Sequence, residues 1–188
     1  MKENSNVSKS ESKLALFNKR SVKDYLIFTA IILGVVIIDQ LTKWLAVKYL
    51  APNGDFPLIK GVLHLTYLEN EGAAFGMLKD KPWVFNVVST IGITVMALYL
   101  YLGQAPGKLS EIALAMVIGG GIGNMIDRLT LHYVVDFINF ELIDFYIFNG
   151  ADSFVCVGAA LLIFTLLIAL IDEYKKEKEE KRKDGSGK

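Results

Sequence analysis

Histidine, cysteine and proline are scarce in this chain of 188 residues, which contains two, one and four of them respectively. The single cysteine, Cys156, excludes a disulfide within the chain and lies in an apolar run, where a free cysteine is ordinarily a small buried side chain. His64 and His132 do not form a zinc-binding spacing such as His-Glu-x-x-His, so we expect no metal and no other cofactor. Ser89 and Ser153 lack a convincing His or Lys base, which disfavours a serine nucleophile.

An excess of one charge is also missing, because 20 Lys and Arg residues balance 20 Asp and Glu residues. The chain therefore has no overall positive field that would attract nucleic acid. Apolar sequence is abundant instead: 53% of the residues are hydrophobic and the mean hydropathy is +0.40. The first, second and fourth of four candidate membrane spans are long enough to cross a bilayer, and the third is glycine-rich and borderline. These spans lie at residues 25–50, 83–102, 111–126 and 153–174.

Basic residues gather at both ends of this apolar region. With four spans both termini lie on one side, and the positive-inside rule places that side in the cytoplasm. The turn at residues 103–110 then faces inward as well. Four outer lysines oppose this orientation, but they are spread over a longer loop. The residues concerned are Lys2, Lys9, Lys13, Lys19, Arg20 and Lys23 before the first span, Lys175, Lys176, Lys178, Lys181, Arg182 and Lys183 after the fourth, and Lys48, Lys60, Lys79 and Lys81 outside.

Three regions follow from this layout. Residues 1–24 are polar and predict a disordered cytoplasmic extension. Residues 25–174 form the membrane domain, and residues 175–188 form a charged cytoplasmic tail that ends like a linker. No Ala-x-Ala-like site follows the first apolar segment, so we expect an uncleaved first span and not a removable signal peptide.

The outer loop between the first two spans, residues 51–82, has strand character. Leu63, Leu65 and Tyr67 alternate onto one face, and residues 56–59 are placed to pair with them. We therefore predict a membrane α-helical fold with four transmembrane helices. A small extracytoplasmic β-sheet between the first and second helices would rest on the outer membrane surface. A short outer segment would join the third and fourth helices.

This topology brings most of the polar residues of the membrane domain to one depth, near the outer interface. Several of them also have ordinary structural interpretations. Asp39 and Lys43 can form an internal ion pair, Asp127 can anchor a helix end, and Asn70 and Asn149 can cap turns. The glycines of the third span most often indicate close helix packing in lipid. The residues that converge are Asp39, Lys43, Asn70, Asn124, Asp127, Arg128, Asp136, Asn149 and Asp152.

Asp136 and Asp152 are harder to explain structurally, because each has apolar neighbours and no adjacent basic residue. A carboxylate in such surroundings is costly to keep ionised. Two carboxyl groups brought together at a partly dry site share one proton. Such a pair can activate a water and also protonate the substrate, which is the chemistry of aspartic proteases.

Five short segments resemble, in order, the motif boxes of bacterial lipoprotein signal peptidase (signal peptidase II): DQLTK at 39–43, NEGAAFG at 70–76, GGIGNMIDR at 120–128, VVDFI at 134–138 and FNGADS at 148–153. The resemblance implies an intramembrane aspartic endopeptidase that removes the signal peptide from diacylglyceryl-modified prolipoproteins, cutting before the lipidated cysteine. It implies Asp136 and Asp152 as the catalytic pair, and Asn124 and Arg128 as residues that hold the substrate backbone. The supporting residues it implies are Asp39, Lys43, Asn70, Gly72 and Asn149.

The same resemblance implies a monomer in the bacterial cytoplasmic membrane, with membrane lipids and lipidated prolipoproteins as partners and the active site near the outer leaflet. The loop at 51–82 is then a candidate clamp for the extended signal peptide. Asp144 is a rival second acid that lies in no motif box. A transporter is the main alternative function, since intramembrane charges also mark ion pathways, but the chain shows no internal repeat. A structural or chaperone-like membrane subunit would have little reason to keep both aspartates.

Overall fold

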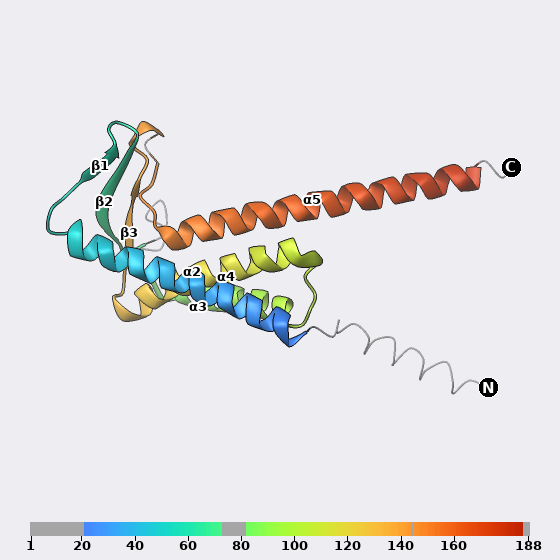
Figure 1. Cartoon of the computed structure of the whole chain (residues 1–188), viewed down its shortest axis with the longest axis horizontal. Helices are drawn as coiled ribbons and strands as arrows, with labels where there is room; N and C mark the ends of the chain where they lie inside the picture. The colour runs from blue at the N-terminus through green and yellow to red at the C-terminus, as the bar shows by residue number, and fades with distance from the viewer. Residues whose placement is uncertain (1–20, 73–81, 144, 186–188) are drawn as a thin grey trace.

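Four helices and a small sheet make up the computed structural model, which describes residues 21–72, 82–143 and 145–185. In the described residues the helices are α2 (Val22–Tyr49), α3 (Pro82–Tyr101), α4 (Gly107–Thr130) and α5 (Gly150–Gly185). They lie side by side, the sheet stands across one end of them, and α5 projects beyond the other end (Figure 1). The four predicted helices are therefore confirmed.

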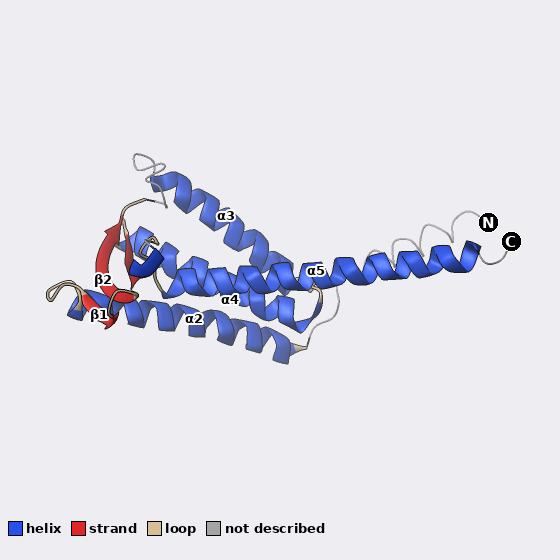
Figure 2. Ribbon diagram, turned by 90° about the horizontal axis from the view of Figure 1, so that it is seen from above, coloured by secondary structure: helices blue, strands red, loops and turns tan. Residues whose placement is uncertain are grey.

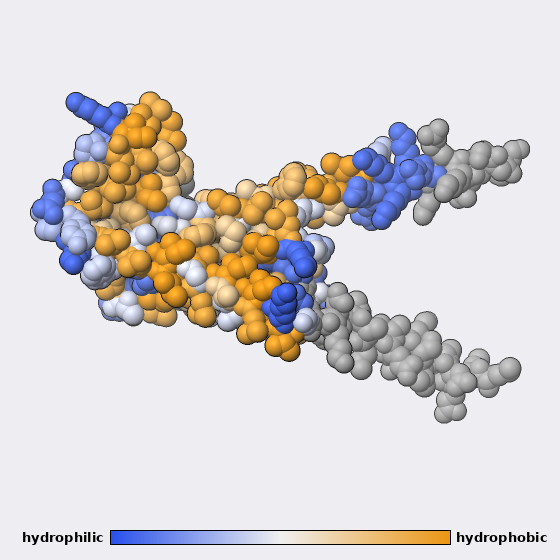
Figure 3. Space-filling view, in the orientation of Figure 1, coloured by the Kyte–Doolittle hydropathy of each residue, from blue (hydrophilic) through white to orange (hydrophobic). Residues whose placement is uncertain are grey.

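Three helical segments in the described residues are each long and apolar enough to cross a bilayer, namely Val22–Tyr49, Gly107–Thr130 and Gly150–Glu179. The apolar part of α3, Asn86–Tyr101, is shorter. Helix α3 as a whole has 20 residues, and the third predicted span, glycine-rich and borderline by hydropathy, is one of the three segments that are long and apolar enough. Apolar surface covers the sides of the helices and the projecting end of α5 is hydrophilic, as Figure 3 shows.

Helix α2 begins at Val22, three residues before the predicted start of the first span. A capping box fixes this start: the Ser21 hydroxyl accepts from the Lys23 backbone N–H at 3.3 Å, and Asp24 accepts from the Ser21 backbone N–H at 3.2 Å. These bonds satisfy N–H groups that a helix start leaves unpaired. The predicted extension otherwise falls on residues 1–20, which lie outside the described residues.

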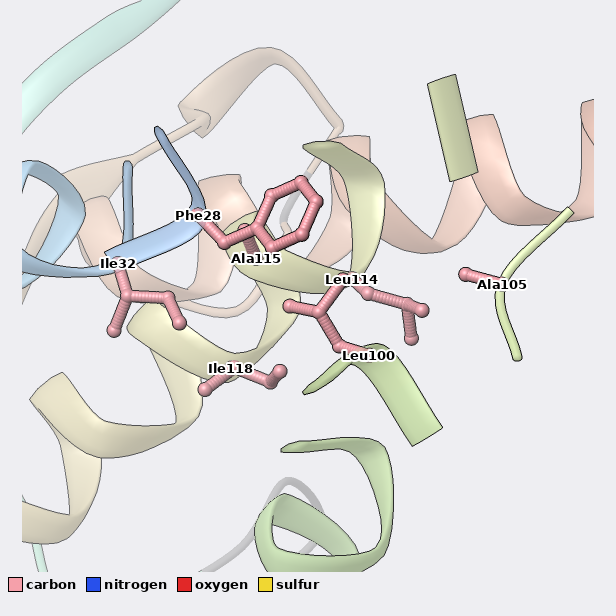
Figure 4. Close-up of a cluster of buried hydrophobic side chains, with 7 residues drawn as sticks. All are labelled: Phe28, Ile32, Leu100, Ala105, Leu114, Ala115 and Ile118. Carbon is pink, nitrogen blue, oxygen red and sulfur yellow. The ribbon is translucent and has the colours of Figure 1, made fainter. Parts of the chain in front are cut away.

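Helix α4 is the central helix, with α2 and α3 on opposite sides of it in Figure 2. Its glycines allow this packing. A Cβ added at Gly119 would lie 2.8 Å from the Cβ of Val35 on α2, and one at Gly120 would lie 2.5 Å from the carbonyl oxygen of Ala151 on α5. The prediction of close packing at the glycine run is confirmed for these positions. Between α2, α3 and α4 lies a core that includes Phe28, Ile32, Leu100, Leu114, Ala115 and Ile118 (Figure 4).

The sheet has three antiparallel strands in the order β1 (Phe56–Ile59), β2 (Leu63–Asn70), β3 (Val134–Asn139). The predicted pairing of the first two strands is confirmed. The segment between α4 and α5 was expected to be only a short connection, and this was wrong, because it contributes β3 and pairs with β2.

One face of the sheet packs against the C-terminal end of α2. Leu65 and Tyr67 lie against a buried cluster of Ala46, Val135 and Phe137. Alternate residues of a strand point to opposite faces, so burying Val135 and Phe137 turns Asp136 between them to the other face. The packing of the sheet on α2 therefore sets the direction of the Asp136 side chain.

Candidate active site

The end of the helices that carries the sheet brings the predicted site residues into one cluster. Asp39 and Lys43 come from α2, Asn124 from α4, Asn149 and Asp152 from the start of α5, Asp136 from β3 and Asn70 from the end of β2. Gly72 joins them by donating its backbone N–H to the Asn70 side-chain oxygen at 3.1 Å. Arg128 lines the same pocket as Asp136 and Asp152.

Asp136 is buried, with 1% of its surface exposed. Its two carboxyl oxygens accept from Asn70 Nδ2 at 2.8 Å and from Asn149 Nδ2 at 2.7 Å. Burial raises the pKa of Asp136 to about 6, and the nearby charge of Asp152 acts in the same direction. The two amide hydrogen bonds and the charge of Lys43 oppose the rise. Asp136 therefore changes protonation close to neutral pH, where acid–base catalysis is most effective.

Asp152 stands in the first turn of α5 and forms a capping box with Asn149. The Asp152 backbone N–H donates to Asn149 Oδ1 at 3.0 Å, and the Asn149 backbone N–H donates to Asp152 Oδ2 at 3.2 Å. Asn124 Nδ2 donates to the other carboxyl oxygen of Asp152 at 2.7 Å. The cap and the hydrogen bond from α4 together fix this carboxylate at the start of the helix.

Lys43 is the centre of the support beneath the pocket. Its ammonium lies 2.9 Å from Asp39, 3.0 Å from Asp127 and 2.9 Å from the side-chain oxygen of Asn124. The predicted ion pair of Asp39 and Lys43 is confirmed. A buried charge is tolerated where it is paired and hydrogen-bonded, and Lys43 has three oxygen partners.

Asp127 has a different place from the one expected. It was predicted as an interfacial anchor, but it is 2% exposed and therefore not at a surface. Its oxygens accept from Gln40 Nε2 at 2.8 Å and from the Val135 backbone N–H at 3.1 Å. Asp39 likewise accepts from the Ala151 backbone N–H at 2.8 Å. These two acids tie α2 and α4 to the residues next to Asp136 and Asp152. Asp39 was expected among the supporting residues, whereas the role of Asp127 was missed in the sequence analysis.

The pocket above this support has a volume of about 890 Å³. Asn70, Asn124, Arg128, Asp136 and Asp152 supply its polar wall. Residues 145–148, three of which are aromatic, also line the pocket and form its aromatic wall. Arg128 interacts electrostatically with Asp152, Asp136 and Asp127, and so places positive charge beside the carboxylates.

Two further predictions concern this pocket. Cys156 was expected to be a small buried side chain, and this was wrong, because it is exposed and lines the pocket one turn after Asp152. The exposure follows from its helical spacing, which puts residues four apart on the same face. Asp144, the rival acid, lies outside the described residues. Among the residues that the structure describes, no three His, Cys, Asp or Glu side chains form a group that could hold a metal ion.

Fold and site together define a helical protein of membrane type, with two carboxyl groups from separate elements in one pocket. Comparison with known proteins gives the family. The model of the family described as signal peptidase (SPase) II matches residues 31–168. The chain belongs to the signal peptidase II family, a family of aspartic peptidases, and is thus a membrane protease.

Two relatives are named lipoprotein signal peptidase. The protein of Caldanaerobacter subterraneus subsp. tengcongensis is 47% identical over 137 residues, which are 73% of this chain and 93% of the relative. That of Streptococcus pyogenes is 41% identical over 140 residues, which are 74% and 92%. A bacterial membrane enzyme solved by the in meso method at 1.9 Å resolution has a TM-score of 0.69 and 33% identity, covering 75% of this chain and 92% of the solved one.

Proposed function

We propose that this protein removes the signal peptide from diacylglyceryl-modified prolipoproteins by cutting the bond before the lipidated cysteine. Family membership supports the substrate class. The observation that carries the chemistry is the shared pocket of Asp136 and Asp152, which are both bonded to Asn149. A reaction of this kind needs one ionised and one protonated carboxyl group at the scissile bond.

In the proposed reaction the ionised carboxylate removes a proton from a water molecule. The oxygen of that water attacks the peptide carbonyl carbon at the same time. The protonated carboxyl group gives its proton to the carbonyl oxygen, and the resulting tetrahedral intermediate collapses with protonation of the amine that leaves. The raised pKa of Asp136 favours Asp136 as the member that holds the shared proton. Arg128 and Asn124, which line the pocket, hold the substrate backbone.

We infer four membrane spans with both termini in the cytoplasm. Strand β2 follows α2, and strand β3 follows α4, yet both belong to one sheet. The two connections therefore lie on the same side, and α3 and α4 must each cross. The basic residues at both ends place the termini inside, so the pocket opens at the outer leaflet. There the acyl chains of a lipidated cysteine stay in the bilayer while its peptide bond reaches the carboxylates. The protein acts as a monomer.

A cleavage assay in detergent tests this function. The purified protein should convert a diacylglyceryl-modified precursor to a faster-migrating band, and mass spectrometry should find the cut directly before the modified cysteine. The same precursor with serine in place of that cysteine should stay intact. Cleavage at another bond would contradict the proposal, as would inhibition by a chelator that added zinc reverses.

A further inference from the structure

His64 on β2 lies between two carboxylates at the outer end of the molecule. Its Nδ1 is 2.6 Å from Asp55, which precedes β1, and its Nε2 is 2.8 Å from Glu141. Glu141 begins η2 (Glu141–Ile143), a short 3-10 helix that follows β3. The His64 side chain is only 15% exposed, whereas both carboxylates are largely in solvent. One imidazole thus joins two parts of the sheet region that are far apart in the sequence.

The protonation state of His64 decides how many of these contacts can exist. Carboxylates only accept hydrogen bonds, and an imidazole ring carries protons on both nitrogens only when it is positively charged. A neutral ring that keeps its proton on Nδ1 still donates to Asp55. Its Nε2 is then an acceptor, and the Gly61 backbone N–H is in place to donate to it at 3.4 Å. When the His64 ring loses one proton, its Nε2 therefore gives up Glu141 as a hydrogen-bond partner and accepts from Gly61 instead.

Asp55 stays an anion through this exchange. The Thr66 hydroxyl donates to it, and that bond, followed by the contact with His64, holds the pKa of Asp55 below its usual value. The charged groups that face His64 in the described residues are Asp55, from the segment before β1, and Glu141, from η2. Across the strand pair it meets the neutral Asn139. The imidazole is thus the one basic side chain at the centre of this cluster, placed between two carboxylates.

Little else holds η2 against the sheet. None of its residues is buried, and Leu142 is 68% exposed. Its backbone contact with the β1–β2 hairpin is a 3.5 Å hydrogen bond from the Leu142 N–H to the carbonyl of Val62 in the turn before β2, at the long limit for such a bond. The ion pair of His64 and Glu141 is therefore the main side-chain tie between η2 and β2 among the described residues.

The position of η2 is coupled to the aromatic wall of the pocket. The Phe145 N–H donates to the Phe140 carbonyl at 3.3 Å, closing the turn that contains η2. Phe140 stacks on Phe148 at 5.7 Å between ring centroids, and Phe145 meets Phe148 edge-on at 5.9 Å. Phe145 and Phe148 both line the pocket. Phe148 is held to Ile138 of β3 by backbone hydrogen bonds, so a movement of η2 reaches the pocket wall through Phe145.

We propose that His64 is a protonation-dependent latch: as the imidazolium it holds η2 on the sheet and fixes the aromatic wall, and as the neutral ring it releases Glu141. The effect on catalysis rests on the proposed function, since the wall contacts substrate only if the pocket is the cleavage site. In the proposed orientation the latch faces the outside, so external pH controls it. Substrate therefore binds more tightly at acidic pH than at alkaline pH.

Spin labels measure the latch without any assay of activity. In a Cys156→Ala background, labels at Lys60→Cys and Leu142→Cys, both exposed positions, report the distance between the β1–β2 turn and η2. We expect one narrow distance distribution at about pH 5 and a second, longer component at about pH 8, the range over which free imidazole changes charge. An unchanged distribution would overturn the proposal.

Three substitutions sharpen the test. Glu141→Gln should keep the short distance at both pH values, because an amide accepts from the imidazolium and donates to the neutral ring. Glu141→Ala should show the long component at both. Glu177→Gln, on the exposed end of α5, should behave like the unsubstituted protein. A pH response in Glu141→Gln equal to that of the unsubstituted protein would contradict the role of Glu141.

Cleavage kinetics test the link to the pocket. The ratio of the KM of the native protein to that of Glu141→Gln should rise by roughly threefold to tenfold between about pH 5 and about pH 8. This is the effect expected for the loss of one hydrogen bond. The ratio of their kcat values should stay constant, which also removes the titration of Asp136 from the comparison. A KM ratio that is independent of pH would contradict the link. Absence of all cleavage would count against the proposed function and leave the distance result standing.

Discussion

Asn149 connects the two carboxyl groups more directly than any other residue that the structure describes. Its Nδ2 donates to Asp136 at 2.7 Å and to Asn124 at 3.0 Å, and its backbone N–H and Oδ1 pair with Asp152. The sequence offered two interpretations of this residue, a turn cap and a support of the site. The structure shows the cap, and its partner is Asp152 itself; the support of catalysis stays a prediction.

Asn149→Ser separates these two roles. Serine is a good N-cap, so the free energy of unfolding should fall by less than about 1 kcal/mol. The hydroxyl has a single proton and cannot bridge Asn124 and Asp136, so kcat should fall by about 10²-fold, as for a lost active-site donor. Thermal unfolding in detergent and single-turnover cleavage measure the two effects. If the loss of catalysis, expressed as a free energy, were equal to the loss of unfolding free energy, Asn149 would act only as a cap.

Asp136 makes the stability of the protein depend on pH. Its pKa rises from 3.8 to about 6 on folding, so the folded protein binds this proton more tightly than the unfolded chain. Folding is then penalised as the pH rises through that window, by about 2–3 kcal/mol once it is passed. The stability of Asp136→Asn relative to the native protein should therefore improve between about pH 4 and about pH 7. A difference in melting temperature between Asp136→Asn and the native protein that stays constant across this pH range would refute this.

Asp136 and Asp152 could be singled out from sequence because an acid among apolar residues is a local and unusual pattern. The partners of Asp127 could not. Asp127 meets Gln40 and the Val135 N–H only when α2, α4 and β3 are packed together, and nothing local to residues 127–128 indicates that arrangement. A helix-end acid beside an arginine has the same sequence pattern at a surface and in a core.

Among the elements, α4 depends most on its small residues. An added Cβ at Gly120 would meet the backbone of Ala151, and one at Gly123 would meet the Asp39 carboxylate. Both contacts lie directly under the carboxylate pair. The glycine run was predictable as a packing surface, but its length was not: α4 extends four residues beyond the predicted span at each end, because polar and glycine residues lower the hydropathy there.

Gly120→Ala should destabilise the protein by about 1–3 kcal/mol, the usual effect of overpacking, because the Ala151 carbonyl belongs to a helix backbone that cannot turn aside. The shift of Ala151 should also lower kcat through its neighbour Asp152. Gly92→Ala on α3 is the matched control: no atom lies within 4 Å of the added Cβ, so stability should stay equal or rise slightly. Similar melting temperatures for the two variants would contradict this account of α4.

Strand β3 shows what sequence patterns at the level of elements leave open. The β1–β2 hairpin was predictable because its strands are adjacent and one of them alternates. The residues of β3 form a short run that pairs with β2 over a separation of more than sixty positions, for example Asp136 with Leu68. Such a pairing depends on the helices that bring both connections to one end, so no local signal identifies it.

The sheet also decides the topology of the whole molecule. Because β2 and β3 pair, the loop after α2 and the loop after α4 meet at one end of the helices, which supports the four crossings proposed above. Hydropathy alone identifies three strong spans in the described residues. The proposed fourth crossing, α3, is supported by the pairing of the strands and by its own apolar sequence over Pro82–Tyr101.

Labelling of single cysteines tests this topology in intact cells. In a Cys156→Ala background a membrane-impermeant maleimide should modify Lys60→Cys from outside. Lys108→Cys, in the first turn of α4, should react only after the membrane is permeabilised. Both positions are exposed in the structure, so failure to react reports the membrane and not burial. Modification of both from outside would require a different number of spans.

The central claim is that Asp136 and Asp152 act as one acid–base pair on the same peptide bond. Cleavage of the diacylglyceryl-modified precursor by Asp136→Asn and by Asp152→Asn, each purified with a native-like melting curve, tests it most directly. The account predicts that either substitution lowers the rate by at least about 10³-fold, because neither carboxyl group alone can both activate water and protonate the substrate. A rate close to that of the native protein in either variant would contradict it.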